Sequence, residues 1–162
     1  MVTGRDTKAP DSLEEVRRDR ALRDERTIAE VRRNGGIRAD DGALIAILET
    51  IGTVSHERHT KPVCAVQDGD DFFVVASAGG QRRHPDWLRN VLAHPDIQVE
   101  FALRRFRVRA SVEPNGPLRD EVFARLHKLI PGLYEYQDRC RDYRQIPVVR
   151  LTPTAVTGLA RD

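Results

Sequence analysis

Residues 55–62, SHERHTKP, hold the densest group of side chains that could do chemistry. His56 and His59 are three residues apart, Glu57 lies between them, and Arg58 adds a positive charge. Two histidines with a carboxylate could bind a metal ion or act in acid–base catalysis. The cations could instead bind an anion such as a phosphate.

The spacing of the two histidines argues against a metal site. Zinc motifs of the HExxH type place their histidines four apart, on one face of a helix. Here they are three apart, between two apolar runs of strand length. Residues three apart in an extended chain point to opposite faces. We therefore expect no metal site, and we interpret each histidine as a solvated or substrate-facing loop residue.

Composition narrows the class of protein. The chain has 162 residues, which suits one domain, and 27 cationic against 25 acidic residues argue against a nucleic-acid partner. No apolar stretch is long enough to cross a bilayer and no signal peptide begins the chain, so no stable membrane insertion is expected. Cys64 and Cys140 lack CxxC spacing, which predicts a reduced, cytoplasmic protein with a buried free thiol at Cys64.

Three segments follow from the patterns along the chain. Residues 1–11 are predicted to be a flexible lead, residues 12–36 an N-terminal helix, and residues 37–162 a β-rich domain. Ser12 and Glu15 form a capping-box pair that starts the helix. Its first half is almost entirely charged, so only its second half has an apolar stripe to pack.

The β-rich domain is predicted to be mixed α+β with antiparallel strands. Strands are expected at 43–51, on both sides of an Asp68-Gly69 turn within 62–77, and at 97–102, 106–113 and 146–153. Helices are expected at 85–94, 115–129 and 133–141. Arginines alternate with apolar residues from 105 to 110, which predicts one buried and one cationic face. About six strands with outer helices indicate a closed or nearly closed β-barrel.

Several blocks of this sequence together resemble the deazaflavin-dependent nitroreductase family, the coenzyme F420-dependent quinone and nitro reductases. The blocks are PVCAVQDGD, VVASAGG, HPDWLRN, HPDIQVEF, YEYQ and IPVVRLTP, and the resemblance covers about residues 27–153. It implies a split β-barrel, of the kind that binds FMN, holding a flat tricyclic cofactor against its wall. Coenzyme F420 is the cofactor implied, rather than FMN.

The same resemblance gives the opening segment a role. Family members have a loop like G-R-K-S-G-K-P-R-x-x-P, which binds the phosphate and acidic tail of the deazaflavin. This chain has GTVSHERHTKP at those positions, where Gly52, Ser55 and Pro62 match and most of the cations are replaced. Each lost charged contact could cost about 1.5–3 kcal/mol. Partial substitutes are Arg58, Lys61, Arg82 and Arg83.

Candidate site residues follow by position. Those expected to contact the cofactor are Ser55, Arg58, His59, Pro62, Ala76, Ser77, Ala78, Trp87 and Asn90, with Ala78 replacing a family lysine. Candidate catalytic residues are Ser77, Tyr136, His56 and His59. Trp87 at helical spacing suits a packed core as well as a cofactor wall.

The expected activity is hydride transfer from reduced F420 to an electron-poor small molecule of the quinone, nitro or enone type. A homodimer is a possible assembly of the chain. Two alternatives stay open at this level. His56, Glu57 and His59 could act as acid–base groups in a cofactor-independent cyclisation or isomerisation. The protein could also be a non-catalytic binder of a hydrophobic or haem-like ligand.

Overall fold

A computed structural model of the chain describes residues 12–38 and 42–159, so the predicted lead over 1–11 lies outside the described residues. The helices are α1 (Leu13–Arg33), α2 (Asp86–Ala93), α3 (Pro117–Leu129) and α4 (Leu133–Cys140), and a single turn η1 (Ala78–Gly80). The strands are β1 (Ile45–Ile51), β2 (Arg58–Cys64), β3 (Val66–Asp68), β4 (Asp71–Val75), β5 (Asp96–Phe101), β6 (Arg104–Val112) and β7 (Val148–Leu159).

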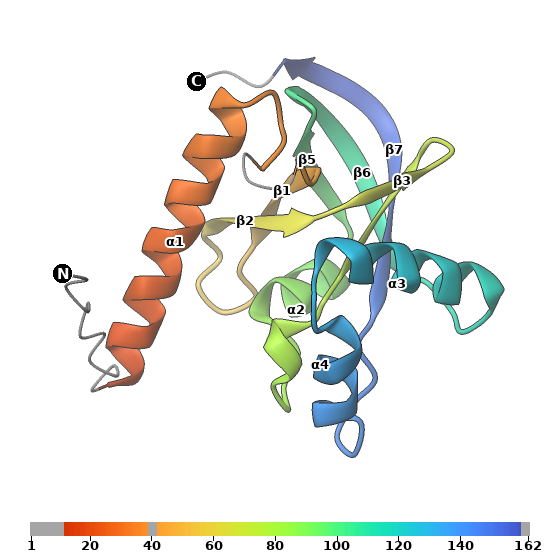
Figure 1. Ribbon diagram of the computed structural model, residues 1–162. Helices are drawn as coiled ribbons and strands as arrows, with labels where there is room; N and C mark the ends of the chain where they lie inside the picture. Colours follow the sequence, from red (N-terminus) through yellow and green to blue (C-terminus); the bar gives the residue numbers. More distant parts are fainter. Residues whose placement is uncertain (1–11, 39–41, 160–162) are drawn as a thin grey trace, which may run out of the picture.

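The strands form one antiparallel sheet in the order β2-β1-β5-β6-β7-β4-β3. The sheet curls so that β2, at one edge, also contacts β4 near the other edge (Figure 1). This half-barrel confirms the predicted α+β class and its antiparallel strands. The seventh strand arises because residues 58–68 divide into two strands, of which β2 pairs with β1 and β3 pairs with β4.

The turn between β3 and β4 differs by one residue from the prediction. Asp68 pairs with Asp71, so the two turn residues are Gly69 and Asp70 rather than Asp68 and Gly69. Gly69 takes a positive φ of 60°, which a tight hairpin turn requires. The predicted hairpin is therefore correct, and its register is shifted by one position.

The core lies on both faces of β4. Phe72 and Val74 pack inside the half-barrel, whereas Phe73 and Val75 pack against α3 and α4. A strand buried on both faces has a continuous apolar sequence rather than an alternating one, as DFFVV does. Because β4 joins the two core regions, the segment that follows it, which begins with Ala76, starts from a rigid position.

Helix α1 contacts the sheet mainly through its C-terminal half. Val31 packs on Ile45 and Ile47 of β1, and Arg32 makes a bidentate ion pair with Glu100 of β5 at 2.9 and 2.7 Å. The first half of the helix is mostly exposed, as its charged sequence predicts. The predicted cap is present as well, because the backbone N–H of Glu15 donates to the hydroxyl oxygen of Ser12.

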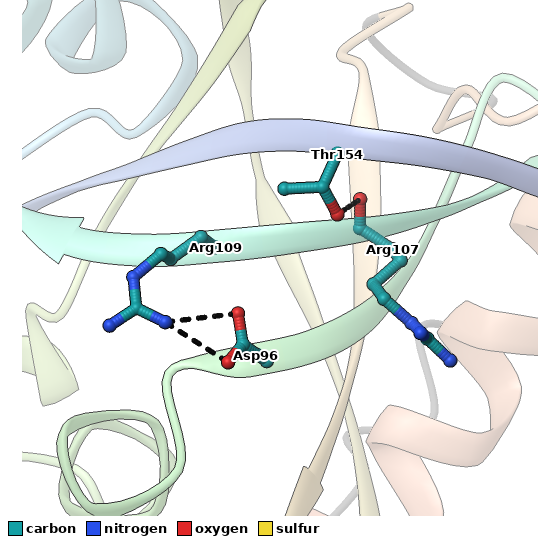
Figure 2. A network of polar contacts seen from close by, with 4 residues as sticks. All are labelled: Asp96, Arg107, Arg109 and Thr154. Atoms are coloured by element: carbon teal, nitrogen blue, oxygen red, sulfur yellow. Dashed lines mark hydrogen bonds and ion pairs between the residues drawn. The ribbon is translucent and has the colours of Figure 1, made fainter.

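Strand β6 has the predicted apolar and cationic faces. Val108 and Ala110 are buried, whereas Arg107 and Arg109 are exposed. Arg109 reaches across to β5 and pairs with both carboxylate oxygens of Asp96 at 3.2 and 3.0 Å (Figure 2). Arg107 extends away from this pair, so the cationic face is only partly neutralised.

Two further features of the described residues bear on the expectations. Both cysteines are free, but Cys64 is half-buried rather than buried, and it is Cys140 that is enclosed. Within residues 12–38 and 42–159, the helices are too short or too polar to cross a lipid bilayer.

Candidate functional site

The connection between β1 and β2, residues 52–57, is a compact turn. The backbone N–H of Gly52 donates to the carbonyl oxygen of Glu57 at 2.8 Å, and that of His56 donates to the carbonyl of Gly52 at 3.0 Å. His56 takes a φ of 57°, which non-glycine residues rarely adopt. A Cβ on Gly52 would overlap the hydroxyl oxygen of Ser55 and lie 2.9 Å from Nε2 of His59. Any larger residue at position 52 would therefore require the side chains of Ser55 and His59 to move.

The structure corrects the interpretation of residues 55–62 as a loop. Strand β2 begins at Arg58, so His59 and Pro62 are strand residues and only Ser55–Glu57 belong to the turn. Pro62 lies opposite Ile47 on an edge strand, where a proline is tolerated. Ser55 and His59 are brought together, with 3.1 Å between Oγ and Nε2. The start of β2 at Arg58 could not be predicted from an alternation of apolar and polar residues, because the first residues of this exposed edge strand are all polar.

Two of the proposed substitute cations already have partners. Lys61 forms an ion pair with Asp24 of α1 at 2.7 Å, and Arg82 lies 4.3 Å over the ring of Tyr143. Arg58 is loosely held, because it is 78% exposed and lies 3.3 Å from Glu49. Of these three cations, Arg58 is therefore the one that can turn toward an anion in the β1–β2 turn at little cost.

Asn90 of α2 connects the β1–β2 turn to the end of β1 through two hydrogen bonds. Its amide oxygen accepts from the backbone N–H of Thr53, and its amide nitrogen donates to the hydroxyl oxygen of Thr50, both at 3.2 Å. Asn90 and Thr50 are both buried. Trp87, one turn earlier, packs into the inner core. Both residues adjoin the site, and in the structure they contact the turn and the core that hold it in place. Direct contact of Asn90 or Trp87 with the cofactor stays a prediction.

The segment after β4 has an uncommon backbone. Ala78, Gly79 and Gly80 follow one another with φ values of 46°, 61° and 77°. Such conformations cost energy at a non-glycine residue, and they are often found at functional sites. Gly80 is buried directly against α4, since a Cβ there would lie 2.8 Å from both Cα and the carbonyl oxygen of Tyr136. The structure therefore brings the segment of Ser77 and the helix of Tyr136 together.

Arg144, just after α4, holds this segment in place. Its guanidinium donates to the carbonyl oxygens of Ser77, Gln81 and Ala76 at 2.6, 2.8 and 3.0 Å. Arg139 of α4 adds a bond of 3.0 Å to the carbonyl of Gly79. The carbonyls on both sides of η1 are thus fixed by the segment around α4, and the side chain of Ser77 is left for other contacts.

Arg144 also contacts His84, whose imidazole has a lowered pKa. Its Nδ1 lies 3.2 Å from a nitrogen of Arg144, so Nδ1 must be the unprotonated nitrogen to accept this bond. Partial burial and the positive charge of Arg144 lower the pKa of His84 below its usual 6.5. The unfolded chain then binds more protons than the folded one as the pH falls through the histidine range.

We therefore expect acid to destabilise the protein through His84. This contribution to stability is complete above about pH 6.5 and is lost as the pH falls through the lower pKa of the folded state. Thermal melts from about pH 7.5 to about pH 5 should show a smaller drop for His84→Asn, which keeps an acceptor without titrating. His94→Asn, at the C-terminus of α2, is the control. Equal slopes for His84→Asn and wild type would contradict the expectation.

Sequence reasoning missed Arg144, Arg139 and Thr50. Arg144 lies in an irregular segment among other charged residues, and no spacing marks it as a partner of residues more than 60 positions away. Thr50 looks like an ordinary strand residue. None of these side chains has a local signal, because each acts through a long-range contact.

The β1–β2 turn suits an anionic group. Within the described part of the chain, the backbone N–H groups of Val54 and Ser55 donate to no other residue. Successive exposed N–H groups make a small anion-binding concavity. Arg58 adds a positive charge and His56 a ring nitrogen, so the residues present fit the acidic tail of a deazaflavin with fewer cations than the family loop has.

Comparisons with known proteins agree with this picture. The family model described as F420H(2)-dependent quinone reductase matches residues 23–153. An F420H(2)-dependent quinone reductase of Mycobacterium tuberculosis is 36% identical over 112 residues, which cover 65% of this chain and 71% of the relative.

Solved structures give the same fold. An F420-H2 dependent reductase, FDR-A, superposes with a TM-score of 0.58 at 28% identity, covering 66% of this chain and 92% of its own. A structure described as a domain-swapped dimer gives a TM-score of 0.60 at 26% identity, covering 86% and 99%. The half-barrel is thus the split-barrel fold that the resemblance implied.

Proposed function

Because this chain belongs to the F420H(2)-dependent quinone reductase family, we propose that it reduces an electron-poor small molecule, of the quinone type, with coenzyme F420. The single observation that carries the proposal is the rigid junction of the Ser77 segment with α4. Three carbonyls and one glycine contact fix this junction at the end of the half-barrel, next to the helix that supports the β1–β2 turn (Figure 1).

Each part of the site has a role in this proposal. The backbone N–H groups of Val54 and Ser55, with the side chains of Arg58 and His56, would hold the acidic tail of the cofactor. The bound cofactor supplies a hydride, and the protein supplies binding and orientation.

The reduction also needs a proton donor, and the candidates lie in the segment around η1 and on α4. The hydroxyls of Ser77 and Tyr136 are the candidate donors to the acceptor oxygen. The Arg139 guanidinium lies 5.7 Å from the ring of Tyr136, so this cation is part of the same region. These roles of Ser77 and Tyr136 are proposed from where the two residues lie, next to η1 and on α4.

The test is a fluorescence titration of the purified full chain with oxidised F420, with FMN in parallel. We expect saturable binding of F420, weaker binding of FMN, and F420H2 oxidation when a quinone is added. No saturable binding of F420 would overturn the proposed function.

Arg58→Gln should lower F420 affinity about tenfold, because one charged contact to a phosphate or carboxylate is lost. The titration should be repeated at raised salt, which weakens the wild type more than the variant. Arg104→Gln, at the exposed first residue of β6, removes the same charge far from the turn and is the control. Equal affinity of both variants would show that Arg58 does not contact the cofactor.

The cofactor-independent alternative gains no support from the geometry. His56, Glu57 and His59 are all exposed, and His59 is engaged with Ser55. An acid–base reaction that must exclude water needs a more enclosed arrangement. A homodimer stays a prediction for this chain; the relative described as a domain-swapped dimer suggests checking the mass in solution.

A further inference from the structure

A groove of about 430 Å³ opens between α3 and α4, at a position that the family function does not explain. Its volume lies within the usual range for small-molecule sites, about 300–1,000 Å³. The groove adjoins the face of α4 that carries Tyr134, whereas the backbone of Tyr136 lies against Gly80. The groove shares Arg144 with the support of the Ser77 segment, but none of the candidate cofactor or catalytic residues lines it, so it is a different site on the same helix α4 (Figure 1).

The charge of the groove is positive. Three arginines line it, Arg119, Arg141 and Arg144, against the single acid Asp120. Arg119 is 8% exposed, donates to the carbonyl oxygen of Ile146 at 2.6 Å, and lies 3.9 Å from Asp120. That ion pair is long, and the Asp120 side chain is 78% exposed, so it neutralises Arg119 only weakly. A buried guanidinium attracts an anion more strongly than an exposed one.

Arg144 adds charge without being a direct donor. Most of its N–H groups are used by the carbonyls of Ala76, Ser77 and Gln81. Arg144 nevertheless stays positively charged. Burial lowers its pKa, but the ordinary pKa of an arginine is far above neutral pH. Arg141 is exposed at the rim. It is therefore the arginine that can turn to make a bidentate contact with an entering anion.

Two aromatic side chains, Phe123 and Tyr134, line the groove beside its polar residues. Phe123 and Tyr134 have ring centroids 5.2 Å apart, with their planes inclined by 59°. The Arg119 guanidinium lies 5.2 Å over the Phe123 ring, which keeps cation and ring side by side. Tyr134 is 47% exposed, so its ring is accessible from the groove. Aromatic side chains and arginines stack well on planar rings.

We propose that this groove is a second binding site, specific for a small planar aromatic anion that carries a phosphate or a carboxylate. The aromatic part packs against Phe123 and Tyr134, and the anionic group pairs with Arg141 and Arg119. Both phosphate and carboxylate match the planar donor fork of arginine. The site does not depend on the proposed reductase activity.

The experiment is isothermal titration of the purified full chain with four probes: phenyl phosphate, benzoate, inorganic phosphate and benzyl alcohol. Phenyl phosphate and benzoate are expected to bind saturably, each at least about fivefold tighter than inorganic phosphate or the neutral alcohol. Comparison of the first two tells whether phosphate or carboxylate is preferred. Arg141→Gln should weaken phenyl phosphate about fivefold or more. Asp120→Asn should tighten it, because it removes the competing carboxylate.

Two control variants locate the binding. Arg104→Gln on β6 removes an exposed cation elsewhere and should leave phenyl phosphate binding unchanged. Arg58→Gln should leave it unchanged too, whereas it weakens F420. Circular dichroism and thermal melts confirm that each variant is folded.

Three results would overturn the second site. The first is no saturable binding of either aromatic anion. The second is inorganic phosphate binding as tightly as phenyl phosphate, which removes the role of the aromatic walls. The third is loss of phenyl phosphate binding in Arg58→Gln but not in Arg141→Gln, which would place the anion at the β1–β2 turn.

Discussion

The Gly80→Ala variant is expected to lose roughly 2–5 kcal/mol of unfolding free energy and the reductase activity. Two costs add at this position. The backbone has a φ of 77°, which an alanine adopts only with strain, and the new Cβ would lie 2.8 Å from the Cα and carbonyl oxygen of Tyr136. Backbone atoms cannot rotate away as a side chain can, so α4 must move. The measurements are urea unfolding and the rate of F420H2 oxidation.

Gly79→Ala is the matched control for this prediction. Gly79 has a similar φ of 61°, but a Cβ there would meet nothing within 4 Å. It should therefore lose only the backbone cost of about 1–2 kcal/mol. The difference between the two variants measures the contact of η1 with α4. Equal losses would mean that this contact does not hold the segment.

Replacement of Arg144 has the second large expected effect. Arg144→Gln leaves the carbonyls of Ala76, Ser77 and Gln81 without their donors, and it should cost roughly 2–4 kcal/mol because the bonds to Ala76 and Ser77 are partly buried. The segment that carries Ser77 then loses its fixed position. We expect a lower melting temperature and a fall in kcat larger than the change in KM, since the cofactor turn is not touched.

Arg144→Lys separates charge from shape. A lysine keeps the positive charge but offers one ammonium group in place of a planar fork, so it should recover only a minor part of the lost stability. Arg139→Gln removes a single bond to the carbonyl of Gly79 and should cost no more than about 1 kcal/mol. Full stability in Arg144→Lys would show that charge alone positions the segment.

Local signals account for much of the fold. The cap of α1, made by Ser12 and Glu15, depends on residues three apart, so it can be predicted without the rest of the chain. The β3–β4 hairpin is similar, because a positive φ at Gly69 specifies a tight turn wherever the strands lie. The start of β2 at Arg58 was missed, because an exposed edge strand is specified by its partner β1 rather than by its own residues.

The candidate site divides in the same way. Its residue types and order pointed to the family. The positions of Ser77 and Tyr136 were expected from the blocks that contain them, and that of Ser55 from the matched loop at 52–62. What holds Ser77 in place was not expected, since Arg144 lies far along the chain. The commitment of Lys61 to Asp24 was also hidden, because it requires α1 to lie beside β2.

By itself, then, the sequence determined the family, the antiparallel half-barrel with its outer helices, and the residue types around the site. The tertiary structure alone decided which cations have partners, which carbonyls Arg144 holds, and that α3 and α4 enclose an arginine-lined groove. The physical reason is range. Caps, turns and strand patterns depend on interactions between residues a few positions apart, whereas ion pairs, buried donors and grooves depend on segments that meet only when the chain has folded.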